Sequence, residues 1–483
     1  MSTATATTTP ATPDAFDRLG ERVADAINPI VVKEVRQGLR TRVFTIFFAV
    51  MLAANLLISL VAFAFADEGG TRTGQDAFMA YFVALACVQF FVIPYSAYRS
   101  MSREAEEETW VLLTLTGLGP RRILAGKVAS FVLQGTLYAS AAAPFLLFSY
   151  YLNGIDLPTI VVALATSIAY QLFLVALSVS MATLAETRLV RGLLHFVLLG
   201  LLLQGLGFGI GGTAGAMELS RKALADGVFW LSALAGTFAM VTTGMLFFEL
   251  AAARLSLPSE DYARGPRRWY LVQAVGMLAF FLWGYAASGE RGVLVAGALS
   301  QAAHALLVGQ TVASDRDGMA RVHWATGKRF SPFKPGALRG FTVVTVVTLA
   351  AGALYAVPGF SAGDPGMEAV IIAAPAFALV YLATPQIVAR WVPHPPSQTA
   401  LMVRVLAFGL FVLGVGLPPL VGELVAEADN LALNLLNPTV GLVNVAKAKV
   451  DALPLVLVPW GVALGVTAWA FAVLRRHDVE PLA

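Results

Sequence analysis

The sequence has few charged residues. Asp, Glu, Lys and Arg make up 13% of its 483 residues, against roughly 25% in an ordinary soluble domain. Hydrophobic residues make up 58%, and a soluble fold could not bury that much apolar surface while facing water. The composition therefore excludes an ordinary soluble enzyme. A bilayer accepts such a chain when the backbone polar groups are bonded within helices or a closed barrel.

Cysteine is nearly absent as well. Cys87 is the only one and lies in an apolar run, so no intramolecular disulfide can form. The sequence also lacks an N-glycosylation acceptor, because Asn437-Pro438-Thr439 contains the forbidden proline. Residues 1–13 are mostly Thr and Ala and lack the basic start and apolar centre of a secretory signal. We expect them to be a disordered tail.

Motifs for catalysis are missing too. A Walker A loop requires G-x-x-x-x-G-K-[ST], and neither Gly126-Lys127 nor Gly327-Lys328 has the required flanking residues. Residues 359–363 match G-x-S-x-G but fall on a short loop between apolar runs, not on a strand-to-helix elbow. No His, Cys and carboxylate spacing suggests a metal site. We therefore expect no enzymatic activity and no bound cofactor in this chain.

The prominent feature is a series of apolar runs about 20 residues long, the length of a membrane-spanning helix and twice that of a barrel strand. They predict an all-α, polytopic membrane protein with about twelve spans. The predicted spans are 43–66, 77–99, 122–151, 158–185, 192–212, 227–253, 269–287, 292–313, 340–358, 368–389, 400–421 and 453–474.

Basic residues test this topology. On twelve spans, 27 of the 33 Lys and Arg residues fall on one set of alternating loops, together with both termini. Because basic residues accumulate on the cytoplasmic side, this bias predicts that both termini are cytoplasmic. It also supports an even number of spans, since one span more or fewer would invert half of the pattern.

Residues 14–42 are predicted to form an amphipathic helix before the first span. Apolar residues recur there at steps of three and four, and Asn28-Pro29 looks like a helix cap followed by proline at the first helical position. The basic residues Lys33, Arg36, Arg40 and Arg42 lie mostly off the apolar face. We expect a helix in the cytoplasmic membrane interface; the alternative is a helix packed on the protein's own loops.

A second unusual segment comes after the second span. Its charged start and apolar end suit a helix, and its acidic residues suit the positive end of the helix dipole. Crowded like charges suggest docking of a partner, although pairing with Arg99, Arg121 and Arg122 would also explain them. The candidate docking residues are Arg103, Glu104, Glu106, Glu107, Glu108, Thr109 and Trp110.

These two segments together resemble the permease subunits of type-2 ABC exporters. The resemblance covers about the first 270 residues, and Ala105, Glu108, Gly117 and Gly119 depart from the family pattern. The residues that fit it, besides Asn28-Pro29 and the basic stretch after them, are Thr109, Trp110, Leu112, Leu113, Leu115, Thr116, Leu118, Pro120, Arg121, Ile123, Gly126 and Lys127.

The resemblance implies a function and a partner. Residues 43–268 would form the six-helix permease core, with a coupling helix at about 102–116 that docks in a cleft of a separate cytoplasmic ATPase subunit. That subunit would bind ATP and Mg and drive outward transport by alternating access, in a bacterial cytoplasmic membrane. Residues 269–483 would add six helices. The coupling pattern does not recur between the eighth and ninth spans, so we expect a homodimer, or a heterodimer with another permease.

Other features keep alternatives open. A twelve-helix secondary, ion-coupled transporter is the main rival, and Gln301 and His304, on a polar stripe with Gln310, are weak substrate-path candidates. Interhelical hydrogen bonding is the alternative role for His304 and also for His195. The glycine-rich stretch 205–226 would form short re-entrant helices, as in similar exporters, or a flexible linker. The basic, aromatic loop 313–340 favours contact with anionic lipid rather than nucleic acid; the other alternative is a second contact to the ATPase.

Overall fold

The computed structural model describes residues 29–64, 73–106, 119–152, 155–183, 188–223, 227–257, 260–316, 331–359, 365–425, 434–448 and 452–479. Within these ranges every regular element is helical, and twelve helices are long and apolar enough to cross a membrane. Each overlaps one of the twelve predicted spans, which confirms the predicted all-helical fold. The chain is a multi-pass membrane protein.

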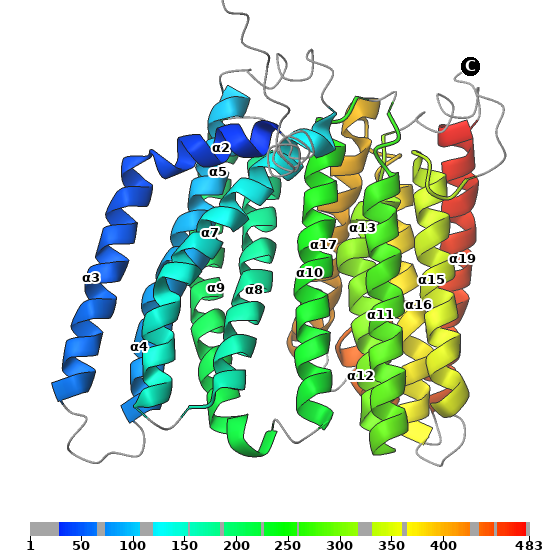
Figure 1. The fold of residues 1–483 in the computed structure, drawn as a ribbon. Helices are drawn as coiled ribbons and strands as arrows, with labels where there is room; N and C mark the ends of the chain where they lie inside the picture. The colour runs from blue at the N-terminus through cyan, green and yellow to red at the C-terminus, as the bar shows by residue number, and fades with distance from the viewer. Residues whose placement is uncertain are drawn as a thin grey trace, which may run out of the picture. The chain divides into compact units, whose positions relative to one another are not determined.

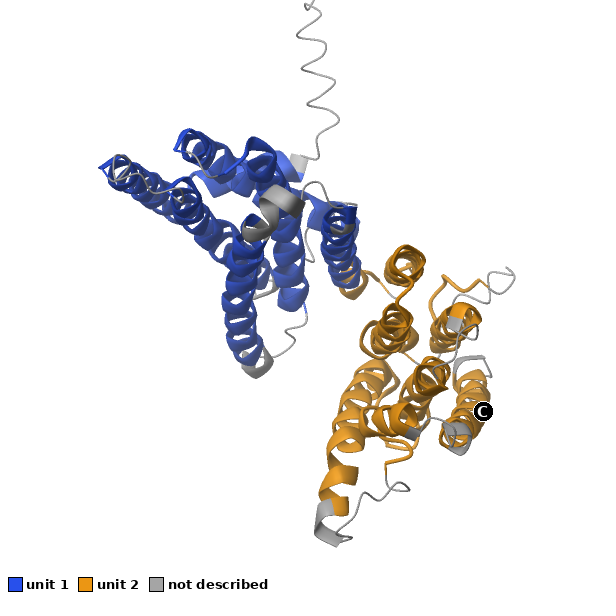
Figure 2. Cartoon of the chain, turned by 90° about the horizontal axis from the view of Figure 1, so that it is seen from below, with its two compact units in different colours: residues 1–251 blue, residues 252–483 orange. Residues whose placement is uncertain are grey.

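The helices divide into two compact units, residues 1–251 and 252–483, with the boundary inside α10 (Figure 2). Unit 1 begins with α2, which lies across the ends of its spans (Figure 1). The elements of unit 1 are α2 (Pro29–Leu39), α3 (Arg42–Ala64), α4 (Thr73–Ala86), η2 (Cys87–Val92), α5 (Ile93–Glu106), α7 (Pro120–Tyr151), α8 (Leu157–Thr183), α9 (Arg188–Ala223) and most of α10 (Gly227–Leu255).

In its described residues unit 2 also has six spans, and the short helix α18 comes before the last of them. The elements of unit 2 are α11 (Arg264–Ser288), α12 (Arg291–His304), η3 (Ala305–Gly309), α13 (Gln310–Ala313), α15 (Ala337–Gly359), α16 (Pro365–Val388), η4 (Pro396–Gln398), α17 (Thr399–Val425), α18 (Val440–Ala448) and α19 (Ala452–Val479).

The second span of each unit contains a π-helical insertion at the same place. In unit 1, the 14-residue α4 leads into η2; in unit 2, the 14-residue α12 leads into η3. A π-turn adds a residue within a helix and shifts the register of the next turns, and such insertions are rare. Their recurrence at one position indicates that the two units share an architecture.

The packing of the spans repeats as well. In both units the second span contacts the first, third, fourth and fifth, and the third also contacts the first and fourth. The fifth span packs on the fourth in both units, as α9 on α8 and α17 on α16. The sixth span also meets the fourth, through Gly244 beside the Phe173 backbone in unit 1 and along α19 and α16 in unit 2. Helices far apart in the sequence therefore adopt equivalent neighbours.

The centre of unit 2 is α16, which contacts α12, α15, α17, α18 and α19. Ala373, Ala374, Ala376 and Ala378 are nearly fully buried along it. Small residues let neighbouring helices approach closely in the membrane, where packing rather than the hydrophobic effect holds helices together. This explains why α16 is the most enclosed span.

Two details differ from the sequence-based expectations. Residues 205–223 continue α9 as helix, so the predicted linker or separate re-entrant helices were wrong for that stretch. Helix α18 was not predicted, although Asn437 caps its start by accepting hydrogen bonds from the Thr439 and Val440 backbone N–H groups at 3.0 and 3.1 Å. Asn437-Pro438 is the same cap-and-proline signal that was recognised at Asn28-Pro29.

Candidate functional site

Helix α2 connects to the spans through one face and leaves the other open. It packs on α7, with Ile30 buried and Gly38 against the Gln134 side chain. The predicted interfacial residues Lys33, Arg36, Arg40 and Arg42 are all exposed. Of the predicted helix, residues 14–28 lie outside the described part. The described part therefore has both a protein-packed face and an open basic face.

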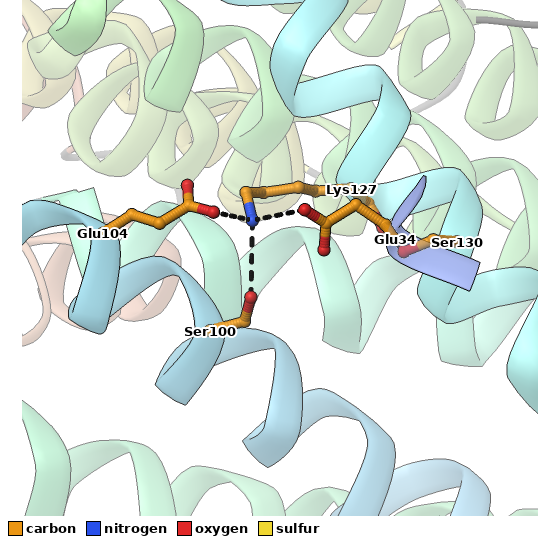
Figure 3. Close-up of polar contacts among 5 residues, drawn as sticks. All are labelled: Glu34, Ser100, Glu104, Lys127 and Ser130. Carbon is orange, nitrogen blue, oxygen red and sulfur yellow. Dashed lines mark hydrogen bonds and ion pairs between the residues drawn. The ribbon is translucent and has the colours of Figure 1, made fainter. Parts of the chain in front are cut away.

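The face that packs on α7 contains a buried ion cluster around Lys127, shown in Figure 3. Lys127 is 1% exposed. Its Nζ lies 2.5 Å from Glu104 Oε1 on α5 and 3.4 Å from Glu34 Oε1 on α2. It also donates to Ser100 Oγ on α5 at 3.3 Å. We call these four residues the Lys127 cluster.

The cluster provides a hydrogen-bond acceptor for every N–H donor of the Lys127 ammonium group. An ammonium group has three N–H donors, and the cluster supplies three acceptors. A buried charge without partners would be strongly unfavourable, because desolvation is not compensated. The cluster therefore joins three elements: α2, the last turns of α5, and the start of α7.

The cluster includes one of the predicted docking residues, Glu104. Residues 102–106 continue α5 to its end at Glu106, with Arg103 exposed and Glu104 bound to Lys127. The Glu106 side chain lies outside the described part. So do the remaining predicted docking residues, which are Glu107, Glu108, Thr109 and Trp110.

A second ion pair joins α7 to α10. Arg121 Nε donates to Glu249 Oε2 at 2.8 Å. The Arg121 side chain is 48% exposed and that of Glu249 is 13% exposed. Arg121 was one of the cations that could have neutralised the acidic segment, and its described partner is Glu249. Water screens the exposed arginine, so this pair contributes little to stability.

Unit 2 has its own polar junction between its second and third spans, centred on Asp315. Asp315 Oδ2 accepts from the Gly336 N–H at 2.7 Å, and its Oδ1 accepts from Tyr262 Oη at 2.7 Å. Gly336 has a φ of 128°, a left-handed conformation that favours glycine. Burial, and then the neighbouring Asp315 carboxylate, raises the pKa of Tyr262, so the phenol stays protonated and acts as the donor.

A buried arginine completes this junction. Arg267, 2% exposed at the start of α11, donates to the carbonyls of Pro332 (2.7 Å), Lys334 and Gly336 (2.8 Å). A guanidinium presents several donors in a rigid fork, which suits a row of carbonyls. We call Tyr262, Arg267, Asp315 and Gly336 the Asp315 junction. It joins the residues on either side of 317–330, which lie outside the described part.

The weak substrate-path candidates are buried in unit 2. His304 Nε2 lies 3.1 Å from Gln273 Oε1 on α11, and its ring stacks on Tyr270 at 4.8 Å. Gln301 is 3% exposed, and its amide atoms have no hydrogen-bond partner among the described residues. His195 of unit 1 contacts Tyr95 Oη at 3.4 Å. Both histidines thus take part in interhelical contacts.

Sequence reasoning missed the partners in both junctions. Lys127 was noted only as part of a Gly-Lys pattern, and Glu34 and Asp315 were not singled out. The available signal was a charge placed at the edge of an apolar run, because such a charge needs a partner. The identity of the partner depends on which helices meet.

Comparison with known proteins gave no match among family models, curated proteins or solved structures. The proposed function therefore rests on the geometry of the chain itself.

Proposed function

We propose that the chain is the transmembrane permease subunit of an ATP-driven ABC exporter, powered by a separate cytoplasmic ATPase subunit that holds ATP and Mg. The Lys127 cluster is the observation that carries the proposal. Glu104, one of the predicted docking residues, binds Lys127 of the third span, and Lys127 also binds Glu34 of α2. A push on that segment would therefore be transmitted into the span bundle.

The electrostatics of the cluster suit such a link. Lys127 faces two carboxylates, one on each neighbouring element. If α5 moves relative to α2, the ammonium can stay bonded to one carboxylate while its contact with the other lengthens. A desolvated pair is also much less screened by salt than a surface pair. The cluster can thus follow a movement of α5 while the ammonium keeps one carboxylate partner.

The proposal includes an orientation and a membrane. Both termini and the segment after the second span would be cytoplasmic, as the distribution of basic residues predicts. The exposed Lys33, Arg36 and Arg40 of α2 would then face anionic head groups, each contributing about 1 kcal/mol near the surface. The bacterial cytoplasmic membrane fits this arrangement.

Mild-detergent purification of the tagged chain from its native host tests the proposal. We expect a co-purifying subunit that hydrolyses ATP. Replacing Glu106, Glu107 and Glu108 by lysine should release it, whereas a neutral change at an exposed site away from the segment, Trp469→Phe, should not. If the chain purifies with no ATPase at stoichiometric level, the proposal is wrong.

A secondary transporter is the second candidate, and two observations favour it. Six-helix repeats are common in such transporters, and the two units repeat their packing. Unit 2 also buries His304, Gln273 and Gln301 within its spans. Transport by proteoliposomes would separate the two functions. ATP dependence that persists in the presence of a protonophore supports the exporter, and collapse of uptake with the ion gradient supports the rival.

A further inference from the structure

Three arginines of unit 2 lie at one face of the membrane. Arg254 lies in the last turn of α10, Arg316 follows α13, and Arg404 lies in the second turn of α17. Two spans separate Arg254 from Arg316, and two more separate Arg316 from Arg404. An even number of crossings returns the chain to the same face each time. We call these three residues the Arg404 patch.

Arg404 binds α13 through neutral acceptors. Its Nε donates to Ser314 Oγ at 2.9 Å, and its Nη2 donates to the Thr311 carbonyl at 3.2 Å. The ion pairs formed among the described residues do not include Arg404. A charged side chain within a membrane span is unfavourable and usually pairs with an opposite charge. Arg404 therefore keeps a positive charge and further N–H donors that an anion could bind.

The charges around Arg404 also favour an anion. Arg254 lies close enough for the two guanidinium groups to repel each other, while the Asp315 carboxylate attracts Arg404. The oxygens of Asp315 already accept hydrogen bonds from two backbone N–H groups and a tyrosine hydroxyl. An anion bound between Arg254 and Arg404 would replace their repulsion by two attractive contacts.

An exposed apolar face continues from the patch along α17. Four exposed apolar residues recur there at steps of three and four and so lie on one side of the helix: Leu401, Val405, Phe408 and Val412. Arg404 borders this face, and α17 has the smallest buried share of the twelve spans. A free phosphate ion would contact only the arginines, whereas a phospholipid would also place an acyl chain along the apolar face. The combination therefore favours an amphiphile.

We infer that the Arg404 patch binds the phosphate of an anionic phospholipid, with an acyl chain along the exposed face of α17. A guanidinium group presents its N–H donors in a fork that suits phosphate oxygens, and basic pockets between spans on the cytoplasmic side bind anionic head groups. The bound head group joins the end of α10 to the start of α17. Its place in the cytoplasmic leaflet rests on the proposed orientation, whereas the binding itself does not require the ATPase subunit.

Native mass spectrometry of the full chain in mild detergent tests the inference, whether or not an ATPase co-purifies. Phosphatidylglycerol and phosphatidylcholine are added separately at equal concentration, because both contain a phosphate but only phosphatidylglycerol has a net negative charge. We expect the chain to retain phosphatidylglycerol more tightly than phosphatidylcholine, and equal retention would overturn the inference. Loss of the bound phosphatidylglycerol to an equal concentration of inorganic phosphate would show that the site takes the free ion and would overturn the lipid assignment.

Removal of single charges locates the site. Arg404→Gln and Arg254→Gln should each weaken the binding of phosphatidylglycerol about tenfold, because each removes charge-assisted hydrogen bonds to the phosphate. Arg475→Gln changes an exposed arginine at the same membrane face, at the end of α19, and as the matched control should leave the binding unchanged. Arg254 is exposed, so its replacement should leave the fold intact. Undiminished binding in Arg254→Gln would refute the site.

Discussion

The Lys127 cluster of unit 1 and the Asp315 junction of unit 2 both connect the second span to the third, but they are built from different chemical groups. The Lys127 cluster joins side chain to side chain, through one ammonium and two carboxylates. The Asp315 junction joins side chain to backbone, through three carbonyls bound by Arg267 and one N–H bound by Asp315. Long charged side chains can exchange partners as helices shift, whereas backbone groups are fixed by the fold. We therefore regard the Lys127 cluster as adjustable and the Asp315 junction as rigid.

The largest expected effect is in unit 1. Lys127→Met leaves Glu34 and Glu104, whose side chains are 12% and 20% exposed, without their cation, which should lower the free energy of unfolding by about 3–5 kcal/mol. Equilibrium unfolding in mild detergent, followed by tryptophan fluorescence, measures this loss. Adding Glu34→Gln and Glu104→Gln to Lys127→Met should recover most of it, since no buried charge remains. An unchanged stability in Lys127→Met would show that the cluster is not a desolvated ion group.

The matching change in unit 2 should have a smaller effect. Asp315→Asn replaces the charge that accepts from Gly336 and Tyr262 and should lower the free energy of unfolding by about 1.5–3 kcal/mol. The same unfolding assay applies. Asp76→Asn, at an exposed position in the first turn of α4, is the control and should change little. Equal losses in the two variants would contradict the role of the Asp315 junction.

Two glycine substitutions compare a position where an added Cβ would meet backbone atoms with a position where it would meet a flexible side chain. A Cβ on Gly340 would collide with the Val312 carbonyl and the Arg267 guanidinium, whereas one on Gly38 would meet only the flexible Gln134 side chain. Gly340→Ala should therefore destabilise by about 1–3 kcal/mol, and Gly38→Ala by clearly less. Thermal unfolding of the two variants measures the difference. A larger loss of stability in Gly38→Ala than in Gly340→Ala would show that the surroundings of Gly38 are the more rigid.

The smallest effect is expected at the partly exposed pair of unit 1. Arg121→Gln removes the ion pair with Glu249 and should lower the free energy of unfolding by about 0.2–1 kcal/mol. The loss should disappear at high salt, because water and ions screen the arginine, whereas the loss in Lys127→Met should persist. Unfolding at low and high ionic strength checks this, and a salt-independent loss would show that the pair is shielded from solvent.

Part of the architecture could be predicted because the controlling physics is local. Each span is an apolar run long enough to cross the hydrocarbon core, so each of the twelve helices overlaps a predicted span, although α5 and α9 extend well beyond the predicted ends. The missed α18 was also locally encoded, since Asn437 caps it and Pro438 comes next.

The π-insertions η2 and η3 had no comparable signal. The stretch from Cys87 to Val92 is as apolar as its surroundings, and a π-turn forms where neighbouring helices favour the shifted register. The extension of α9 to Ala223 was missed for a related reason. Glycine disfavours helix in water, but it is common in membrane helices. Within a bilayer no water is present to bond the backbone N–H and C=O groups, so they bond to one another in a helix.

The sequence by itself determined that the chain is a helical membrane protein with twelve spans, because hydrophobic length and backbone hydrogen bonding leave no other solution in a bilayer. Only the tertiary structure decided that Lys127 meets Glu34 and Glu104, that Asp315 and Arg267 hold the approach to α15, and that the two units repeat their packing. These contacts join residues far apart in the sequence. Their partners are therefore set by how whole helices pack, which the spacing of residues along one helix does not specify.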